Sequence, residues 1–294
     1  MKPGLFIVGA PKCGTTAWVK YLGDHPRIAF SKIKEPHYFA LDLPGFREVQ
    51  TEREYEALFS NAGDAAVLGE ASVLYLFSTT AAEEIRKYNP DAHILILLRP
   101  QEEYLPSWHQ QLLYTFQEKL DDFGEAWRLS GHRRPDTIPE TCKEPKLLDY
   151  KAMGRFHEQV ARFLVNFPSS QVCVLRFEEW VRDPRKTYLE VLSFLGVEDD
   201  GRTEFRPVNE AKRHRWDALG KMLQYPPKWL LPPIRLAKAA LGKESLGLAD
   251  ALTNLNRKSD KTAVDPQLEA EIRAFYRQDN RLLDDLLARE EAPA

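Results

Sequence analysis

The residues best suited to chemistry lie near the start of the chain, in the segment Gly9-Ala10-Pro11-Lys12-Cys13-Gly14-Thr15-Thr16. This segment follows the apolar run Leu5–Val8 and opens a helical pattern over Thr15–Gly23, so it predicts a turn between a buried strand and a helix. Unpaired N–H groups at the start of a helix, together with the helix dipole, favour a bound phosphate. A lysine and two threonines in the turn add a cation and hydroxyl donors. We therefore expect the turn to hold a phosphate group.

The turn differs from the phosphate loop of nucleoside triphosphatases in one position. That loop reads GxxxxGK followed by Ser or Thr, and Gly9 and Gly14 have its spacing. Thr15 stands where the lysine belongs, and the lysine lies earlier, at Lys12. This loss argues against triphosphate hydrolysis and against a nucleotide kinase. A kinase stays open as an alternative, as do a catalytically silent nucleotide-binding protein and an ordinary strand-turn-helix joint.

A second anion-binding pair is predicted after the apolar run His93–Leu98. Arg99 follows this run directly, and Ser107 lies eight residues later, in a helical pattern over 100–120. Open α/β sheets bind ligands at the carboxyl ends of their strands, and a guanidinium can hold a phosphate through two hydrogen bonds. The alternative is that Arg99 forms a surface ion pair and Ser107 is an ordinary helix residue.

The elements that must position these residues alternate along the chain. Continuous apolar runs indicate strands covered on both faces, and their alternation with helical patterns indicates an α/β fold with a central parallel sheet flanked by helices. Strands are predicted over 5–8, 65–68, 93–98 and 172–175, and helices over 15–23, 79–87, 100–120, 188–195 and 266–287. We expect one domain over 1–294, with an irregular insertion at about 121–148 and a helical part at about 210–290.

The composition excludes several classes of protein. Of 294 residues, 43% are hydrophobic and 29% charged, as in soluble globular proteins, and a net charge of −3 gives no basic signal for nucleic acid. Cys13, Cys142 and Cys173 lack the spacing of a structural zinc site. No signal peptide or long apolar span is visible, which favours a cytoplasmic location. The apolar, basic stretch Trp229–Leu241 is predicted to dock on the protein body, with peripheral membrane contact as the alternative.

The phosphate-binding turn resembles the 5'-phosphosulfate-binding loop of sulfotransferases, PKxGTT, at every specified position. Arg99 and Ser107 likewise resemble the 3'-phosphate motif of that family. The resemblance implies a P-loop-like fold and the donor 3'-phosphoadenosine 5'-phosphosulfate, with no metal required. It implies that the donor is bound by Pro11, Lys12, Cys13, Gly14, Thr15 and Thr16 together with Arg99 and Ser107. It also implies that Lys12 contacts the bridging oxygen and the sulfonate.

The segment Ser31–Phe39, which reads SKIKEPHYF, resembles a KEPHFF-like segment of carbohydrate sulfotransferases and their bacterial relatives. The resemblance implies that Glu35 is the general base and that Lys34 or Lys32 lies near the sulfonate. His37 is the rival base, because its unperturbed pKa suits proton transfer at neutral pH. The alternative is an exposed structural segment without a catalytic role.

Two further segments resemble the family's donor site and complete the expectations. Arg176-Phe177-Glu178-Glu179 resembles the bacterial pattern RYED, which implies that Phe177 lies near the adenine, with a packing role as the alternative. The basic residues Lys212 and Arg213 stand where the family brings a basic loop over the donor, and a solvated charge run is the alternative. The expected partners are a small nucleotide donor and a glycan, lipid or carrier-bound acceptor with a hydroxyl or amine.

Overall fold

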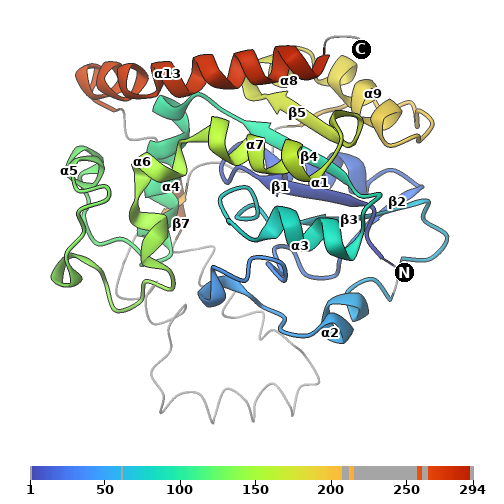
Figure 1. The fold of residues 1–294 in the computed structure, drawn as a ribbon, viewed down its shortest axis with the longest axis horizontal. Helices are drawn as coiled ribbons and strands as arrows, with labels where there is room; N and C mark the ends of the chain where they lie inside the picture. The colour runs from blue at the N-terminus through green and yellow to red at the C-terminus, as the bar shows by residue number, and fades with distance from the viewer. Residues whose placement is uncertain (1, 61, 207–211, 215–256, 260–263, 292–294) are drawn as a thin grey trace.

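Figure 1 shows a computed structural model of the chain, which describes residues 2–60, 62–206, 212–214, 257–259 and 264–291. Five parallel strands form a sheet in the order β2-β3-β1-β4-β5. Their bounds are β1 Leu5–Gly9, β2 Ile28–Phe30, β3 Val67–Ala71, β4 His93–Leu98 and β5 Val172–Arg176. All of β1 and all but the first residue of β4 are buried, which explains their continuous apolar sequences. The predicted parallel sheet is confirmed.

Helices cover both faces of the sheet. In Figure 1, α3 and α7 lie in front of the strands and α1 lies behind them. The helices of the described part are α1 Thr15–Gly23, α2 Glu52–Ala57, α3 Ala81–Tyr88, α4 Gln101–Tyr114, α5 Phe123–Arg128, α6 Tyr150–Met153, α7 Phe156–Asn166, α8 Phe177–Arg182, α9 Pro184–Phe194 and α13 Pro266–Glu291. None of them is both long enough and apolar enough to cross a membrane.

The strand order fixes where a ligand can be held. The chain leaves β1 through α1 towards β2, on one side of the sheet, and returns through α3 to β4 on the other side. The carboxyl end of β1 is therefore a topological switch point, where open α/β sheets bind ligands. The predicted phosphate-binding turn, Gly9–Thr16, begins at this end.

The C-terminal helix α13 packs against α4 and α7. The side-chain amides of Gln101 in α4 and Asn280 in α13 bond each other reciprocally, at 2.7 and 3.1 Å. The Tyr276 hydroxyl adds bonds of 3.0 Å to the carbonyls of Tyr150 and Lys151. The Gln101–Asn280 pair holds the start of α4, directly after the predicted anion-binding arginine, and the Tyr276 bonds hold α6.

Two regions differ from the prediction. The insertion at 121–148 is not wholly irregular, because it contains α5 and two short 3₁₀ turns, Pro135–Thr137 and Pro145–Leu148. Asp122 caps α5, which has six residues, too few for a helical period to stand out in the sequence. Within the part at about 210–290 that was predicted to be helical, the described residues form α13 and also an antiparallel pair of short strands, β6 Lys212–His214 and β7 Arg257–Ser259. The segment 229–241 lies outside the described residues.

Candidate active site

The predicted phosphate-binding turn joins β1 to α1 and is tied to the neighbouring strand. The Ala10 N–H donates to the carbonyl of Leu97 over 2.7 Å. Gly14 precedes α1 with a φ of 93°, a left-handed conformation that favours glycine. It has no side chain to cap the helix, so the first N–H groups of α1 are left for water or a ligand. The backbone of the turn is therefore suited to an anion.

The side chains of the turn divide into buried and accessible ones. Pro11, Cys13 and Thr15 are buried, whereas Lys12 and Thr16 are partly exposed. Burial raises the pKa of the Cys13 thiol, so this cysteine packs and is not a reactive thiolate. The Lys12 ammonium donates to Oε1 of Gln111 in α4 over 3.2 Å, a contact across 99 positions that no sequence pattern indicated.

Trp180 of α8 packs against the turn, which the sequence analysis also missed. A Cβ atom at Gly14 would lie 2.5 Å from Cζ2 of Trp180, so close packing as well as φ requires glycine there. The buried Trp180 ring meets Trp18 of α1 edge-on, with centroids 6.1 Å apart. Trp180 follows Phe177 by three residues in α8, and the centroids of the two rings are 5.1 Å apart. This spacing is the sequence signal that could have linked Trp180 to the predicted adenine contact of Phe177.

The second predicted anion site lies where β4 ends. Arg99 follows the strand, and its guanidinium stacks over the ring of Phe177 at 4.7 Å. Nε and Nη2 of Arg99 both donate to Oε2 of Glu103, at 2.9 and 2.7 Å. Ser107 lies one helical turn beyond Glu103 in α4 and is partly exposed. Arg99, Phe177 and Ser107 thus border one region next to the phosphate-binding turn, and the ion pair foreseen as the alternative for Arg99 is present.

The predicted base segment lies beside the end of β3. The Glu35 N–H donates to the carbonyl of Ala71 over 3.0 Å, and Glu35 has a φ of 62°. This bond to the neighbouring strand holds Glu35 in a conformation that non-glycine residues adopt rarely. Its side chain is about a third exposed, so the carboxylate is accessible to solvent.

Lys34 links this carboxylate to the phosphate-binding turn. Its ammonium lies 2.8 Å from Oε1 of Glu35 and donates to the hydroxyl of Thr16 over 2.9 Å. Lys32 instead donates to the Ser60 hydroxyl over 2.7 Å. Of the two lysines considered from the sequence, Lys34 is therefore the one beside the turn.

His37 occupies a different environment from Glu35. Only 2% of its surface is exposed, and its ring lies edge-on to Phe46 and Tyr75, each with centroids 6.0 Å away. The backbone N–H of His37 donates to the Ser72 hydroxyl over 2.9 Å. Burial lowers the pKa of His37 to about 4, although Glu35 acts in the opposite direction, so the ring is neutral at pH 7. A buried ring of this kind is less suited than Glu35 to meet an acceptor.

A fully buried carboxyl lies behind the base segment. Glu70 in β3 accepts a hydrogen bond of 3.2 Å from the Tyr55 hydroxyl. Burial raises the pKa of Glu70 to about 7, while hydrogen bonds from Ser72, Tyr75 and Tyr55 act in the opposite direction. Ser72 and Tyr75 also bond the backbone of the base segment, at His37 and at Phe39. The buried groups around Glu70 therefore fix the backbone that carries Glu35.

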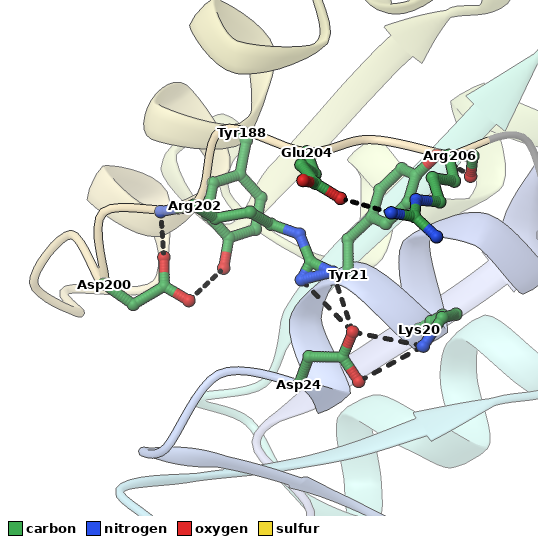
Figure 2. Close-up of polar contacts among 8 residues, drawn as sticks. All are labelled: Lys20, Tyr21, Asp24, Tyr188, Asp200, Arg202, Glu204 and Arg206. Atoms are coloured by element: carbon green, nitrogen blue, oxygen red, sulfur yellow. Dashed lines mark hydrogen bonds and ion pairs between the residues drawn. The ribbon is translucent and has the colours of Figure 1, made fainter.

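The predicted basic residues Lys212 and Arg213 lie in β6, which packs against α4. Their backbone therefore runs beside the helix that carries Ser107. The structure describes only the backbone of these two residues. The chain that leads towards β6 is anchored on α1, as Figure 2 shows. Arg202 donates from both terminal nitrogens to Oδ2 of Asp24, at 3.2 and 2.7 Å.

Comparison with known proteins shows the family to which the chain belongs. A sequence profile of the sulfotransferase domain family matches residues 2–209, more than half of the chain. The chain belongs to the sulfotransferase family. A solved sulfotransferase from Alicyclobacillus acidocaldarius has 30% sequence identity and superposes with a TM-score of 0.63, over 85% of this chain and 99% of that one. The predicted family and P-loop-like fold are confirmed.

Curated sulfotransferases match less of their own length. Human carbohydrate sulfotransferase 15 is 23% identical over 278 residues, which is 75% of this chain and 49% of that protein. Human bifunctional heparan sulfate N-deacetylase/N-sulfotransferase 3 is 25% identical over 202 residues, 66% of this chain and 22% of that protein. This sulfotransferase domain thus spans half or less of these relatives, and the roles of its single residues remain predictions.

Proposed function

We propose that the chain transfers the sulfuryl group of 3'-phosphoadenosine 5'-phosphosulfate to a hydroxyl group of a glycan, with Glu35 as the general base. The observation that carries this proposal is the position of Lys34, whose ammonium lies 2.9 Å from the Thr16 hydroxyl and 2.8 Å from Glu35. The candidate base and the candidate donor loop are thus one side chain apart. In-line transfer needs this proximity, because the attacking oxygen lies between the base and the sulfur.

In sulfuryl transfer, one bond at sulfur replaces another. The acceptor oxygen forms a bond to sulfur while the bond from sulfur to the bridging phosphate oxygen breaks, and Glu35 takes the hydroxyl proton. The leaving 3'-phosphoadenosine 5'-phosphate keeps the electron pair of the broken bond. Lys12 neutralises charge on the bridging oxygen, Lys34 neutralises charge on the sulfonate, and the N–H groups that open α1 bind the 5'-phosphate.

The remaining donor contacts are proposed from the resemblance to the family. Arg99 and Ser107 would bind the 3'-phosphate, Phe177 would contact the adenine, and Lys212 and Arg213 would add positive charge from β6. These cations supply the charge neutralisation, so the proposed reaction uses no metal. In the described part of the chain, no group of three or more His, Cys, Asp or Glu residues is placed to hold one.

The acceptor is proposed from the relatives and from the base. One similar protein is a carbohydrate sulfotransferase, and another is a heparan sulfate N-deacetylase/N-sulfotransferase. Their names support a glycan acceptor for this chain, and a carboxylate base suits an alcohol. An amine, a lipid and a carrier-bound acyl chain are the alternative acceptors.

Calorimetry tests the donor. 3'-Phosphoadenosine 5'-phosphate should bind in the absence of metal, and ATP should bind much more weakly. Tighter binding of ATP would instead support the nucleotide kinase that the missing P-loop lysine argues against. Turnover with sulfur-labelled donor then tests the acceptor, by comparing polysaccharides that carry free hydroxyls, N-deacetylated polysaccharides, and fatty alcohols. Donor binding without transfer to any of them would contradict the catalytic part of the proposal.

A further inference from the structure

The guanidinium proposed to bind the 3'-phosphate already holds a carboxylate of the same chain. Nε and Nη2 of Arg99 both donate to Oε2 of Glu103, at 2.9 and 2.7 Å. These two N–H groups form one edge of the guanidinium fork, and a phosphate bound in the bidentate manner uses an edge of this kind. The described structure therefore shows an internal anion at the place where the nucleotide's phosphate is expected.

The surroundings determine which partner can move. The Arg99 guanidinium is stacked over Phe177 at 4.7 Å, and its side chain is 25% exposed. The Glu103 side chain is 50% exposed, so it can turn into solvent at little cost. Glu103 also lies in the first turn of α4, where the helix dipole favours its negative charge in either position. Arg99 is therefore the held partner and Glu103 the displaceable one.

We propose that Glu103 competes with the 3'-phosphate of the nucleotide for Arg99 and so limits how long the spent nucleotide stays bound. The proposal rests on the proposed assignment of Arg99 to the 3'-phosphate. Donor and product carry the same 3'-phosphate, so this group contributes equally to the binding of both. A carboxylate that pairs with Arg99 again weakens the binding of the product, and it also repels the phosphate because both are anionic.

The test uses Glu103→Gln, which keeps the size of the side chain and removes its charge. Binding of 3'-phosphoadenosine 5'-phosphate should become about 3- to 10-fold tighter, since removal of a partly exposed like charge is expected to have an effect of this size. Binding of adenosine 5'-phosphate, which lacks the 3'-phosphate, should change less than twofold. The gain should appear mainly as slower dissociation of the nucleotide in stopped-flow measurements.

Glu83→Gln is the matched control. Glu83 lies in the first turn of α3 and forms an i,i+4 ion pair of 2.7 Å with Lys87, so the substitution removes the same charge from the same kind of pair. It should leave both nucleotide affinities unchanged. Equal tightening in the two variants would show a general charge effect and would overturn the proposal.

Arg99→Ala separates failure of this inference from failure of the proposed function. If Arg99→Ala removes the preference for the 3'-phosphorylated nucleotide while Glu103→Gln does not tighten it, the 3'-phosphate site stands and the competition is refuted. Weaker binding in Glu103→Gln would mean that Glu103 orients Arg99 for the phosphate, which also refutes the competition. If Arg99→Ala leaves the preference intact, the assignment of the 3'-phosphate site itself is wrong. In the Arg99→Ala background the Glu103→Gln gain should disappear.

Discussion

The proposed donor side and the proposed base segment of this site are built in different ways. The residues Lys12, Arg99 and Phe177, proposed to contact the donor, follow β1, β4 and β5, which have five, six and five residues. The base segment follows β2, which has only three residues; β2 and β5 are the two edges of the sheet. The base segment is held by bonds from Glu35 to Ala71 and from His37 to Ser72, both belonging to the next strand or the loop after it.

The difference has a mechanical consequence. Arg99 and Phe177 directly follow regular strands, whereas the backbone at Glu35 and His37 has φ of 62° and 49° and, like that of Lys12 at 62°, depends on surrounding contacts. We therefore expect substitutions on the donor side to alter nucleotide affinity or charge neutralisation without moving the base. Substitutions in the base segment should alter turnover while nucleotide affinity stays the same.

The largest expected effect belongs to the base itself. Glu35→Gln keeps shape and hydrogen bonding but cannot accept the acceptor's proton, so turnover at saturating donor should fall by about 10²- to 10⁴-fold. Calorimetry should show almost unchanged binding of 3'-phosphoadenosine 5'-phosphate. His37→Gln is the comparison within the same segment and should reduce turnover by less than tenfold. A crippled His37→Gln beside an active Glu35→Gln would reverse the assignment.

Much of the donor side could be predicted from sequence because strand ends and phosphate loops have local signatures. The strand predicted over 93–98 coincides with β4, and Arg99 follows it as expected. The strand predicted over 65–68 begins near the right place but extends to Ala71, since Gly69 and Glu70 interrupt the apolar run although both are buried. β2 was missed because three residues cannot display a period.

The contacts between distant segments of the site could not be predicted from sequence patterns. Lys34 meets Thr16 across 18 positions, and Lys12 meets Gln111 across 99. Contacts of this kind depend on how strands are ordered in space, and neither periodicity nor composition encodes them locally. The close fit of Trp180 against Gly14 is of the same type. Sequence thus indicated which residues belong to the site, and the structure shows how they are connected.

Lys12→Ala should have the next largest effect. Loss of the cation proposed to neutralise the leaving oxygen should reduce turnover by about 10²-fold, while the circular dichroism spectrum stays that of the folded protein. Gln111→Ala, which removes the residue that Lys12 contacts in the described structure, should be much milder. A Lys12→Ala enzyme with nearly normal turnover would remove this residue from the mechanism.

Arg99→Ala combined with Ser107→Ala should act on affinity and not on chemistry. Each charge-assisted phosphate contact is worth roughly 1.5–3 kcal/mol, so binding of 3'-phosphoadenosine 5'-phosphate should weaken by at least about tenfold. Turnover at saturating donor should change far less, since the 3'-phosphate takes no part in bond making. Calorimetry with adenosine 5'-phosphate provides the reference, and an undiminished preference for the 3'-phosphorylated nucleotide would contradict the assignment.

The smallest predicted effect concerns the anchor between α1 and the chain that leads to β6. Arg202 pairs with Asp24 and lies over the ring of Tyr21 at 5.3 Å, and the Tyr21 hydroxyl donates to the carbonyl of Arg206 over 2.9 Å (Figure 2). Arg202→Ala should make the segment 202–206, which leads to β6, less ordered. Because this segment must then lose conformational freedom when the donor binds, donor affinity should fall about two- to fivefold, and the melting temperature should fall by a few degrees.

Arg185→Ala is the control that makes this last prediction informative. Arg185 in α9 pairs with Asp199, so it holds the start of the same chain segment against α9 and not against α1. If α1 is the support that couples this segment to the donor loop, Arg185→Ala should leave donor affinity unchanged even if it lowers the melting temperature slightly. Equal losses of affinity in the two variants would show that general loosening, and not the contact with α1, is responsible. The measurement therefore distinguishes an anchor specific to the donor side from ordinary stabilisation of the fold.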